Sequence, residues 1–173
     1  GDTSTTTNNG LITIGSGTTG SGDIYFADGT SGGSAYRGFV SYKHNGDYLA
    51  FGTAETTRMI IDTSGNVGIG TTSPQPWNSG RVLHIHNSSG NSSELHLTDA
   101  GSGAATGDGS VIHHNSTNLY IQNHEAGPTY FYNNGSPNMI ITSAGNVGIG
   151  TTTPNYKLSV ANASTRIISA TYI

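Results

Sequence analysis

The stretch Met59-Ile-Ile-Asp-Thr-Ser-Gly-Asn-Val-Gly-Ile-Gly-Thr-Thr-Ser-Pro74 recurs almost unchanged 80 residues later as Met139-Ile-Ile-Thr-Ser-Ala-Gly-Asn-Val-Gly-Ile-Gly-Thr-Thr-Thr-Pro154. Repeat architectures copy a supersecondary unit along the chain, whereas an enzyme site rarely needs to be copied. The duplication therefore indicates a repeat protein whose copied residues fix backbone shape and packing. We assign this structural role to Met59, Ile61, Gly65, Asn66, Val67, Gly68, Ile69, Gly70 and Pro74, and to Met139, Ile141, Gly145, Asn146, Val147, Gly148, Ile149, Gly150 and Pro154.

Each copy of the block reads as a β-hairpin. In the first copy, residues 59–62 form one strand, residues 63–66 supply a turn, and the chain returns through Val67-Gly-Ile-Gly. Period-two alternation places Val67 and Ile69 on one face and Gly68 on the other. A glycine within a strand is tolerated where another backbone comes close. Around a threefold axis, three chains would meet either on the glycine side or through their Val/Ile pairs, and the sequence leaves both arrangements open.

The spacing of the copies predicts a domain organisation. Residues 1–10 are a linker or the end of a preceding repeat, 11–78 form repeat 1, 79–154 form repeat 2, and 155–173 begin repeat 3. Prolines at the ends of the blocks mark the junctions, because proline cannot donate a ladder hydrogen bond. Short aromatic and β-branched runs between turn-forming clusters predict strands, with no helical window, at 11–14, 23–26, 38–42, 48–51, 81–86, 94–97, 110–114, 118–122, 129–132 and 156–161.

The composition restricts the function further. Hydrophobic residues make up 32% and charged residues 9% of the 173, so one chain has little with which to build its own core. A net charge of −4 with scattered Lys and Arg offers no surface for a nucleic acid. No apolar run is long enough to insert into a membrane, and the lack of cysteine excludes disulfides. This composition is typical of an all-β fibre in which several chains pool their apolar faces.

The residues resemble a known class of protein. The block from Arg58 to Pro74, its copy ending at Pro154, and the stretches 22–30 and 95–103 are similar to tail-fibre repeats of bacteriophages, a likeness that covers most of the chain from Leu11 onward. The resemblance implies an elongated, parallel homotrimer that projects from a virion, joins other tail proteins and supports attachment to a host-surface glycan or protein. Many such fibres end in a self-cleaving chaperone domain with a Ser/Lys pair, and no residue here matches that pair.

Other classes of function have weaker support in the sequence. A phosphate-binding loop would need a helix after the glycines of the block, but Thr-Thr-Ser-Pro and a β segment follow. A carbohydrate-binding or capsule-degrading spike would show a single acidic cluster beside exposed aromatics. The nearest acidic pairs are Asp23 with Asp28 and Asp99 with Asp108. A cellular surface filament or adhesin built from the same repeat is a third interpretation.

Histidines are the candidate metal ligands. His84 and His86 lie on one face of the expected strand 81–86, so a trimer would bring six imidazoles together, as in fibre tips of the resembling class that hold metal through His-x-His. The alternative is a solvated strand face with Leu83 and Ile85 buried. Because the third repeat has serine and alanine at the equivalent positions, we assign no metal ligand, and likewise no catalytic residue and no cofactor. His113-His114 and His124-Glu125 read as solvated loop groups.

Aromatic residues complete the expectations. The repeated Phe51 and Phe131 are expected in the core as cross-strand partners. Trp77 lies in the linker between repeats and has no counterpart in the second copy, so it is either a junction plug or a surface contact. The sequence thus predicts a non-enzymatic, extracellular structural segment of a virion.

Overall fold

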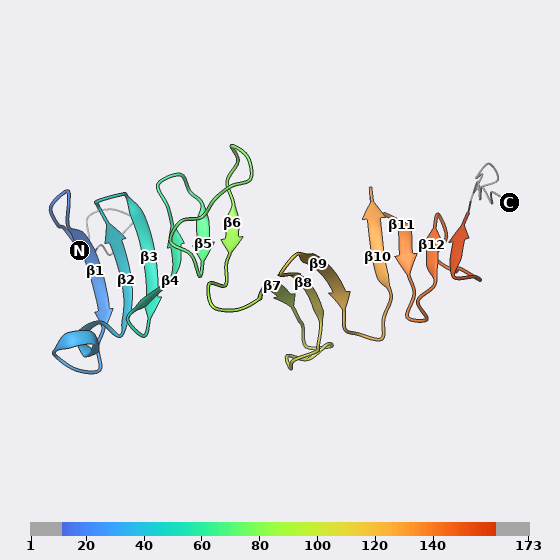
Figure 1. The fold of residues 1–173 in the computed structure, drawn as a ribbon, viewed down its shortest axis with the longest axis horizontal. Coiled ribbons are helices and arrows are strands. Elements are labelled where there is room, and N and C mark those ends of the chain that lie inside the picture. The colour runs from blue at the N-terminus through green and yellow to red at the C-terminus, as the bar shows by residue number, and fades with distance from the viewer. Residues whose placement is uncertain (1–11, 162–173) are drawn as a thin grey trace, which may run out of the picture. The chain divides into compact units, whose positions relative to one another are not determined.

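The computed structural model describes residues 12–161, and nearly all regular structure in them is β-strand (Figure 1). A single-turn 3-10 helix, η1 (Gly32–Tyr36), is the exception, so the expected all-β class is confirmed. The chain divides into two compact units, Gly1–Ser93 and Glu94–Ile173. No helix within residues 12–161 has the length and apolar character needed to cross a membrane.

The first unit contains a six-stranded sheet in which every strand pairs with its neighbours in the sequence. Strands one to five are antiparallel, and the sixth pairs with the fifth in parallel. The η1 turn connects the first two strands. The strands are β1 (Ser21–Phe26), β2 (Gly38–Lys43), β3 (Tyr48–Thr53), β4 (Thr56–Ile61), β5 (Val67–Ile69) and β6 (Leu83–Ile85).

Two smaller sheets follow. One has three strands, in the order β7 (Ser92–Leu97), β8 (Ser110–Asn115) and β9 (Asn118–Asn123). The other has four strands, β10 (Thr129–Asn133), β11 (Ser136–Ile141), β12 (Val147–Ile149) and β13 (Leu158–Val160), and again only the last pair is parallel.

The duplicated block folds the same way twice. Met59 pairs with Ile69 between β4 and β5, and Met139 pairs with Ile149 between β11 and β12. The segment after each block then supplies the parallel strand, β6 or β13, that completes the sheet. Each of these two sheets therefore contains a strand from the following repeat, and in the first of them hydrogen bonds cross the repeat boundary expected after residue 78.

The hairpin turn depends on a side chain that differs between the copies. The Asp62 carboxylate accepts hydrogen bonds from the backbone N–H groups of Ser64 and Asn66, both at 2.9 Å, and from the Asn66 side-chain amide. In the second copy the hydroxyl of Thr142 accepts the N–H of Asn146 at 3.1 Å. Aspartate and threonine both close such turns with a side-chain oxygen, which explains why the exchange preserves the hairpin.

The three glycines of each block have separate roles. Gly65 (φ 79°) and Gly70 (φ 73°) have left-handed backbone conformations, which glycine adopts without steric cost. A Cβ on Gly68 would lie 2.5 Å from the carbonyl oxygen of Thr71 and 3.5 Å from the side chain of Ile60. Gly148 meets Thr151 in the same way. At these two glycines the chain itself fills the space beside the hairpin.

Some expected strands are shorter or missing. Residues 12–14 form no strand, and Leu11 lies outside the described residues, as do 1–10 and 162–173. Of the expected strand 81–86, only Leu83–Ile85 pairs. Ile12 and Ile14 are exposed, at 88% and 45%, so this run lacks a neighbour to hold it in a sheet.

Replacing Gly68 or Gly148 by alanine should destabilise the fold by about 1–3 kcal/mol, because the added methyl group collides with backbone that cannot move aside cheaply. Thermal unfolding of the two variants measures the effect. Gly15→Ala is the matched control, since nothing lies within 4 Å of a Cβ there. Midpoints equal to that of the control would show that the close contact with Thr71 is not a constraint.

Asp62 should make the protein acid-sensitive. Hydrogen bonds from Asn66 are the largest cause that lowers the pKa of this carboxyl below its ordinary value of 3.8, and those from Ser64 and Gly65 add to it. A carboxyl whose pKa is lower in the folded than in the unfolded state stabilises the protein at pH values above its unfolded pKa. This stabilisation is lost as the pH falls through its folded pKa. Asp62→Thr copies the second block and should keep the fold while flattening the loss of thermal stability below pH 4. An unchanged pH dependence would contradict this role.

Candidate functional site

One face of the six-stranded sheet is almost entirely apolar. The strand register places one residue from each strand in a continuous row across the sheet, and a second row runs beside it. We call this side the open face. Its central row consists of Ile24, Val40, Phe51, Met59, Ile69 and Ile85, and its second row of Gly22, Tyr42, Leu49, Ile61, Val67 and Leu83.

No other layer formed by residues 12–93 covers the open face. Ile24, Ile69 and Leu83 are exposed at 48%, 41% and 57% of their surface. The buried apolar residues of the described part of this unit, Ala50 and Ile60, point to the opposite side, since they alternate with residues of the open face. A soluble chain rarely leaves a row of this kind to water unless another surface covers it.

The four-stranded sheet repeats this arrangement. Its central row consists of Phe131, Met139, Ile149 and Val160, each in register with the next. Phe131 and Ile149 are both 43% exposed, while Ile140, on the other side, is buried. The expectation that Phe51 and Phe131 form a core is therefore wrong for a single chain: Phe51 is 36% exposed, because no second layer packs against the rows to which these rings belong.

The three-stranded sheet also has unequal faces. Ile112 pairs with Ile121, and both are largely exposed, at 47% and 62%. On the other face Val111 is buried and the His113 ring packs edge-on against Tyr120, with ring centroids 4.6 Å apart. An exposed apolar side thus recurs in all three sheets of residues 12–161.

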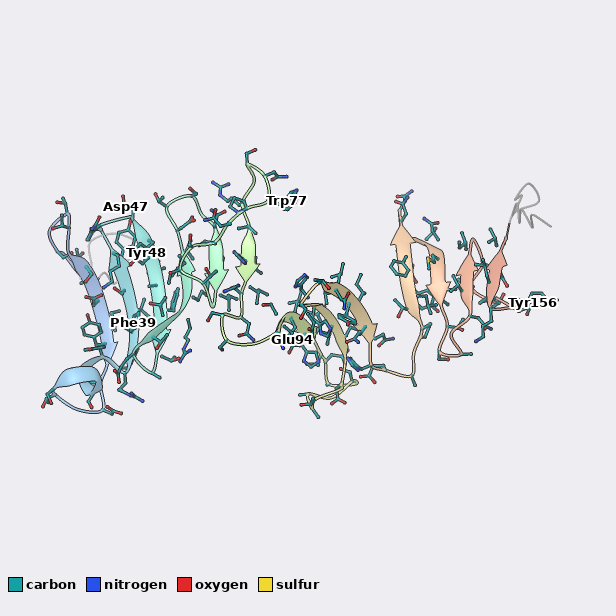
Figure 2. The ribbon with its side chains drawn as sticks, in the orientation of Figure 1. Phe39, Asp47, Tyr48, Trp77, Glu94 and Tyr156 are labelled. Carbon is teal, nitrogen blue, oxygen red and sulfur yellow. The ribbon has the colours of Figure 1, made fainter. Side chains whose placement is uncertain are left out.

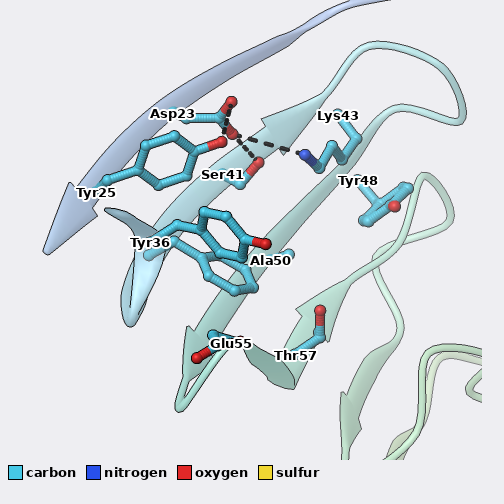
Figure 3. Close-up of a pocket in the computed structure, with 10 residues that line it drawn as sticks. Asp23, Tyr25, Tyr36, Ser41, Lys43, Tyr48, Ala50, Glu55 and Thr57 are labelled. Atoms are coloured by element: carbon cyan, nitrogen blue, oxygen red, sulfur yellow. Dashed lines mark hydrogen bonds and ion pairs between the residues drawn. The ribbon is translucent and has the colours of Figure 1, made fainter. Parts of the chain in front are cut away.

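The opposite side of the six-stranded sheet holds a pocket of about 310 Å³ (Figure 3). Asp23 lies at one end and accepts hydrogen bonds from the hydroxyls of Ser21, Ser41 and Tyr25, with the Lys43 ammonium 3.7 Å away. Partial burial works against ionisation, but these hydrogen bonds and the lysine charge together lower the pKa of Asp23 below its ordinary value. The carboxylate therefore stays ionised and fully hydrogen-bonded.

Aromatic rings form the rest of the pocket wall. Tyr25 and Tyr36 lie 6.1 Å apart between ring centroids, and Phe39 and Tyr48 line the pocket beside them. At the far end the Glu55 carboxylate accepts a hydrogen bond from Arg37 at 2.6 Å. Figure 3 shows the polar cluster around Asp23 at one end of the rings and Glu55 with Thr57 at the other.

The two histidines proposed for a metal lie together, as the alternation predicts. The His84 and His86 ring centroids are 5.9 Å apart, and His84 Nδ1 accepts the backbone N–H of Gln75 at 3.2 Å. Leu83, expected to be buried behind them, is exposed because it belongs to the open face. Among the described residues, no group of three His, Cys, Asp or Glu is placed to hold a metal ion.

The acidic pairs from the sequence serve local structure. Asp28 lies 3.5 Å from Arg37, and Asp99 accepts the N–H groups of Gly101 and Ser102 in a turn. Asp108 accepts the N–H of Ala105. These carboxylates close loops and do not converge on a shared cleft.

The expectation of solvated loop groups is wrong for His113 and His114, which lie in strand β8, where the His113 side chain is only 19% exposed; His124 and Glu125 lie in the loop after β9. Glu125 accepts the N–H of Gly109 at 2.6 Å, and His124 lines a polar pocket with His96 and His113. The Trp77 side chain projects from the loop between β5 and β6 and is fully exposed, so within one chain it is not a plug (Figure 2).

Sequence reasoning did not find the pocket around Asp23. Its lining residues are dispersed over four strands, the η1 turn and the turn between β3 and β4, and only the register brings Asp23, Ser41 and Ala50 side by side. The available signal was the alternation within each strand, which puts Asp23 with Tyr25 and Tyr48 with Ala50 on the same side.

Comparison with known proteins gives no assignment. No protein-family model matches the chain, and no curated protein is significantly similar to it.

Proposed function

We propose that this chain is a structural segment of a bacteriophage tail fibre, a homotrimer in which the copies cover one another's open faces. The observation that supports the proposal most is the recurrence of the same uncovered row, centred on Ile69 in the first unit and on Ile149 in the second. The segment extends an appendage of the virion and presents loops toward a host surface.

The energetics favour association. Fully burying one large aliphatic or aromatic side chain contributes about 1.5–3 kcal/mol, and the open face carries many that are roughly half exposed. Association costs about 4–15 kcal/mol in lost motional freedom. Covering the rows of both repeats outweighs this cost, whereas the few buried residues in each chain give a separate monomer little stability.

The geometry also favours one of the two packing modes. The glycine side of the hairpin is filled by Thr71, so other chains meet the side that carries Val67 and Ile69. In a parallel trimer, the same row of each of the three chains faces the axis at the same level. Identical apolar residues of the three chains then lie together in layers. The threefold symmetry itself rests on the resemblance to tail-fibre repeats.

The chain as a fibre segment has a scaffolding role. Its well-defined repeated residues serve packing and turns, and the variable loops are the part that differs between repeats. The other tail proteins are its expected partners, along with a glycan or protein of the host surface. A cellular filament or adhesin with the same repeat would share this architecture, and genes for capsid and tail proteins beside this one would distinguish the virion.

The mass in solution tests the assembly. Light scattering under native conditions should give three times the 17.8 kDa chain mass, and Ile69→Lys should lower it, because association would bury three ammonium groups against apolar side chains. Thr72→Lys, on an exposed loop residue near the end of the block, is the matched control and should leave the mass unchanged.

A wild-type mass of one chain, or equal masses for both lysine variants, would contradict the proposed interface. If Ile69→Lys does not fold, the wild type still decides the question, because the midpoint of thermal unfolding of a trimer rises with protein concentration and that of a monomer does not.

A further inference from the structure

The pocket on the side opposite the open face is free when the open faces are covered. Asp23, Ser41 and Ala50 alternate with the apolar rows, so association through those rows leaves the pocket facing solvent. The access of solvent to this pocket in the assembly rests on the proposed function. The pocket itself is formed by a single chain.

Its rings present flat apolar surfaces at the centre of the pocket. The Phe39 ring lies over Gly52, in the space that a Cβ there would need. Tyr25 and Tyr36 stand beside it, 52% and 42% exposed. Tyrosine rings have apolar faces and a hydroxyl at the edge. They therefore suit ligands that have one apolar face and hydroxyl groups around it.

The charges of the pocket are balanced internally. Asp23 is paired with Lys43 and Glu55 with Arg37, at 3.7 Å and 2.6 Å. An ionic ligand would have to break one of these pairs, whereas a neutral ligand with hydroxyl groups would only add hydrogen bonds. The hydroxyls of Tyr36, Tyr48 and Thr57 and the Lys43 ammonium supply donors and acceptors around the rings.

The pocket is not required by the repeat. In the second repeat, Pro128 and Pro137 occupy the positions that Tyr48 and Thr57 have in the first. The four-stranded sheet also has no counterparts of β1 and β2, so that β10, which corresponds to β3, is an edge strand of its sheet. The hairpin nevertheless folds the same way. Residues that the scaffold does not need, gathered around a cavity within the size range of small-molecule sites, indicate a binding role.

We propose that this pocket binds a neutral saccharide unit, which stacks on the rings of Tyr36 and Phe39 and hydrogen-bonds to the polar groups around Lys43 and Tyr48. The site assigns the glycan-contacting part of the fibre to the first unit and to the side of the sheet away from the other chains. The proposal is of binding alone, with no bond made or broken in the ligand.

Saturation-transfer NMR on the full chain tests the site, with the methyl glycosides of glucose, galactose, mannose and N-acetylglucosamine as probes. We expect transfer to the ring protons of at least one glycoside, and a loss of about tenfold in affinity for Tyr36→Ala and for Tyr48→Ala. Trp77→Ala removes a fully exposed ring outside the pocket and should leave the signal unchanged.

Two results would overturn the site: no transfer to any of the glycosides at millimolar concentration, or equal losses in the pocket variants and in Trp77→Ala. Transfer to tetramethylammonium, and to none of the sugars, would also overturn it, because rings with carboxylates suit quaternary ammonium groups. The native mass of each sample, measured beside the spectra, separates the two proposals: a trimer that binds no glycoside refutes the site, and a monomer that binds refutes the fibre.

Discussion

The arrangement of this protein depends on apolar side chains that residues 12–161 leave uncovered. In residues 12–161 the buried apolar set is small, consisting of Ala50, Ile60, Val111 and Ile140. The larger apolar side chains stand in rows on one side of each sheet, roughly half exposed. Hydrophobic burial is the dominant favourable term in folding, so covering those rows with another surface would add to the stability of a chain built in this way.

The repeated block makes such a surface from few residues. Its glycines allow the turns and the tight contact with Thr71, and its aspartate or threonine closes the hairpin. Because the following repeat supplies the parallel strand, the sheet continues across the repeat boundary. The two sides of the first sheet therefore differ, with uncovered apolar rows on one and a polar pocket around Asp23 on the other.

Local patterns predicted much of this fold and little of the pocket. The hairpins of the repeated blocks and most strands follow from alternation and turn residues, which act over a few neighbouring positions. The strand expected at 11–14 does not form in its described part, residues 12–14, because strand propensity does not supply a pairing partner. Phe51 was expected to be buried, but a strand pattern shows which face is apolar and not what covers it. The pocket depends on register between distant strands, and no single segment carries that information.

The oxidation of methionine measures the central claim most directly. The chain has two methionines, Met59 and Met139, and both belong to the central rows. If copies of the chain cover these rows, hydrogen peroxide should convert both to the sulfoxide at least about tenfold more slowly in native protein than in urea, because the thioethers are then shielded. Equal rates at both methionines in native and unfolded protein, followed by mass spectrometry, would show that the rows face water and would contradict the account.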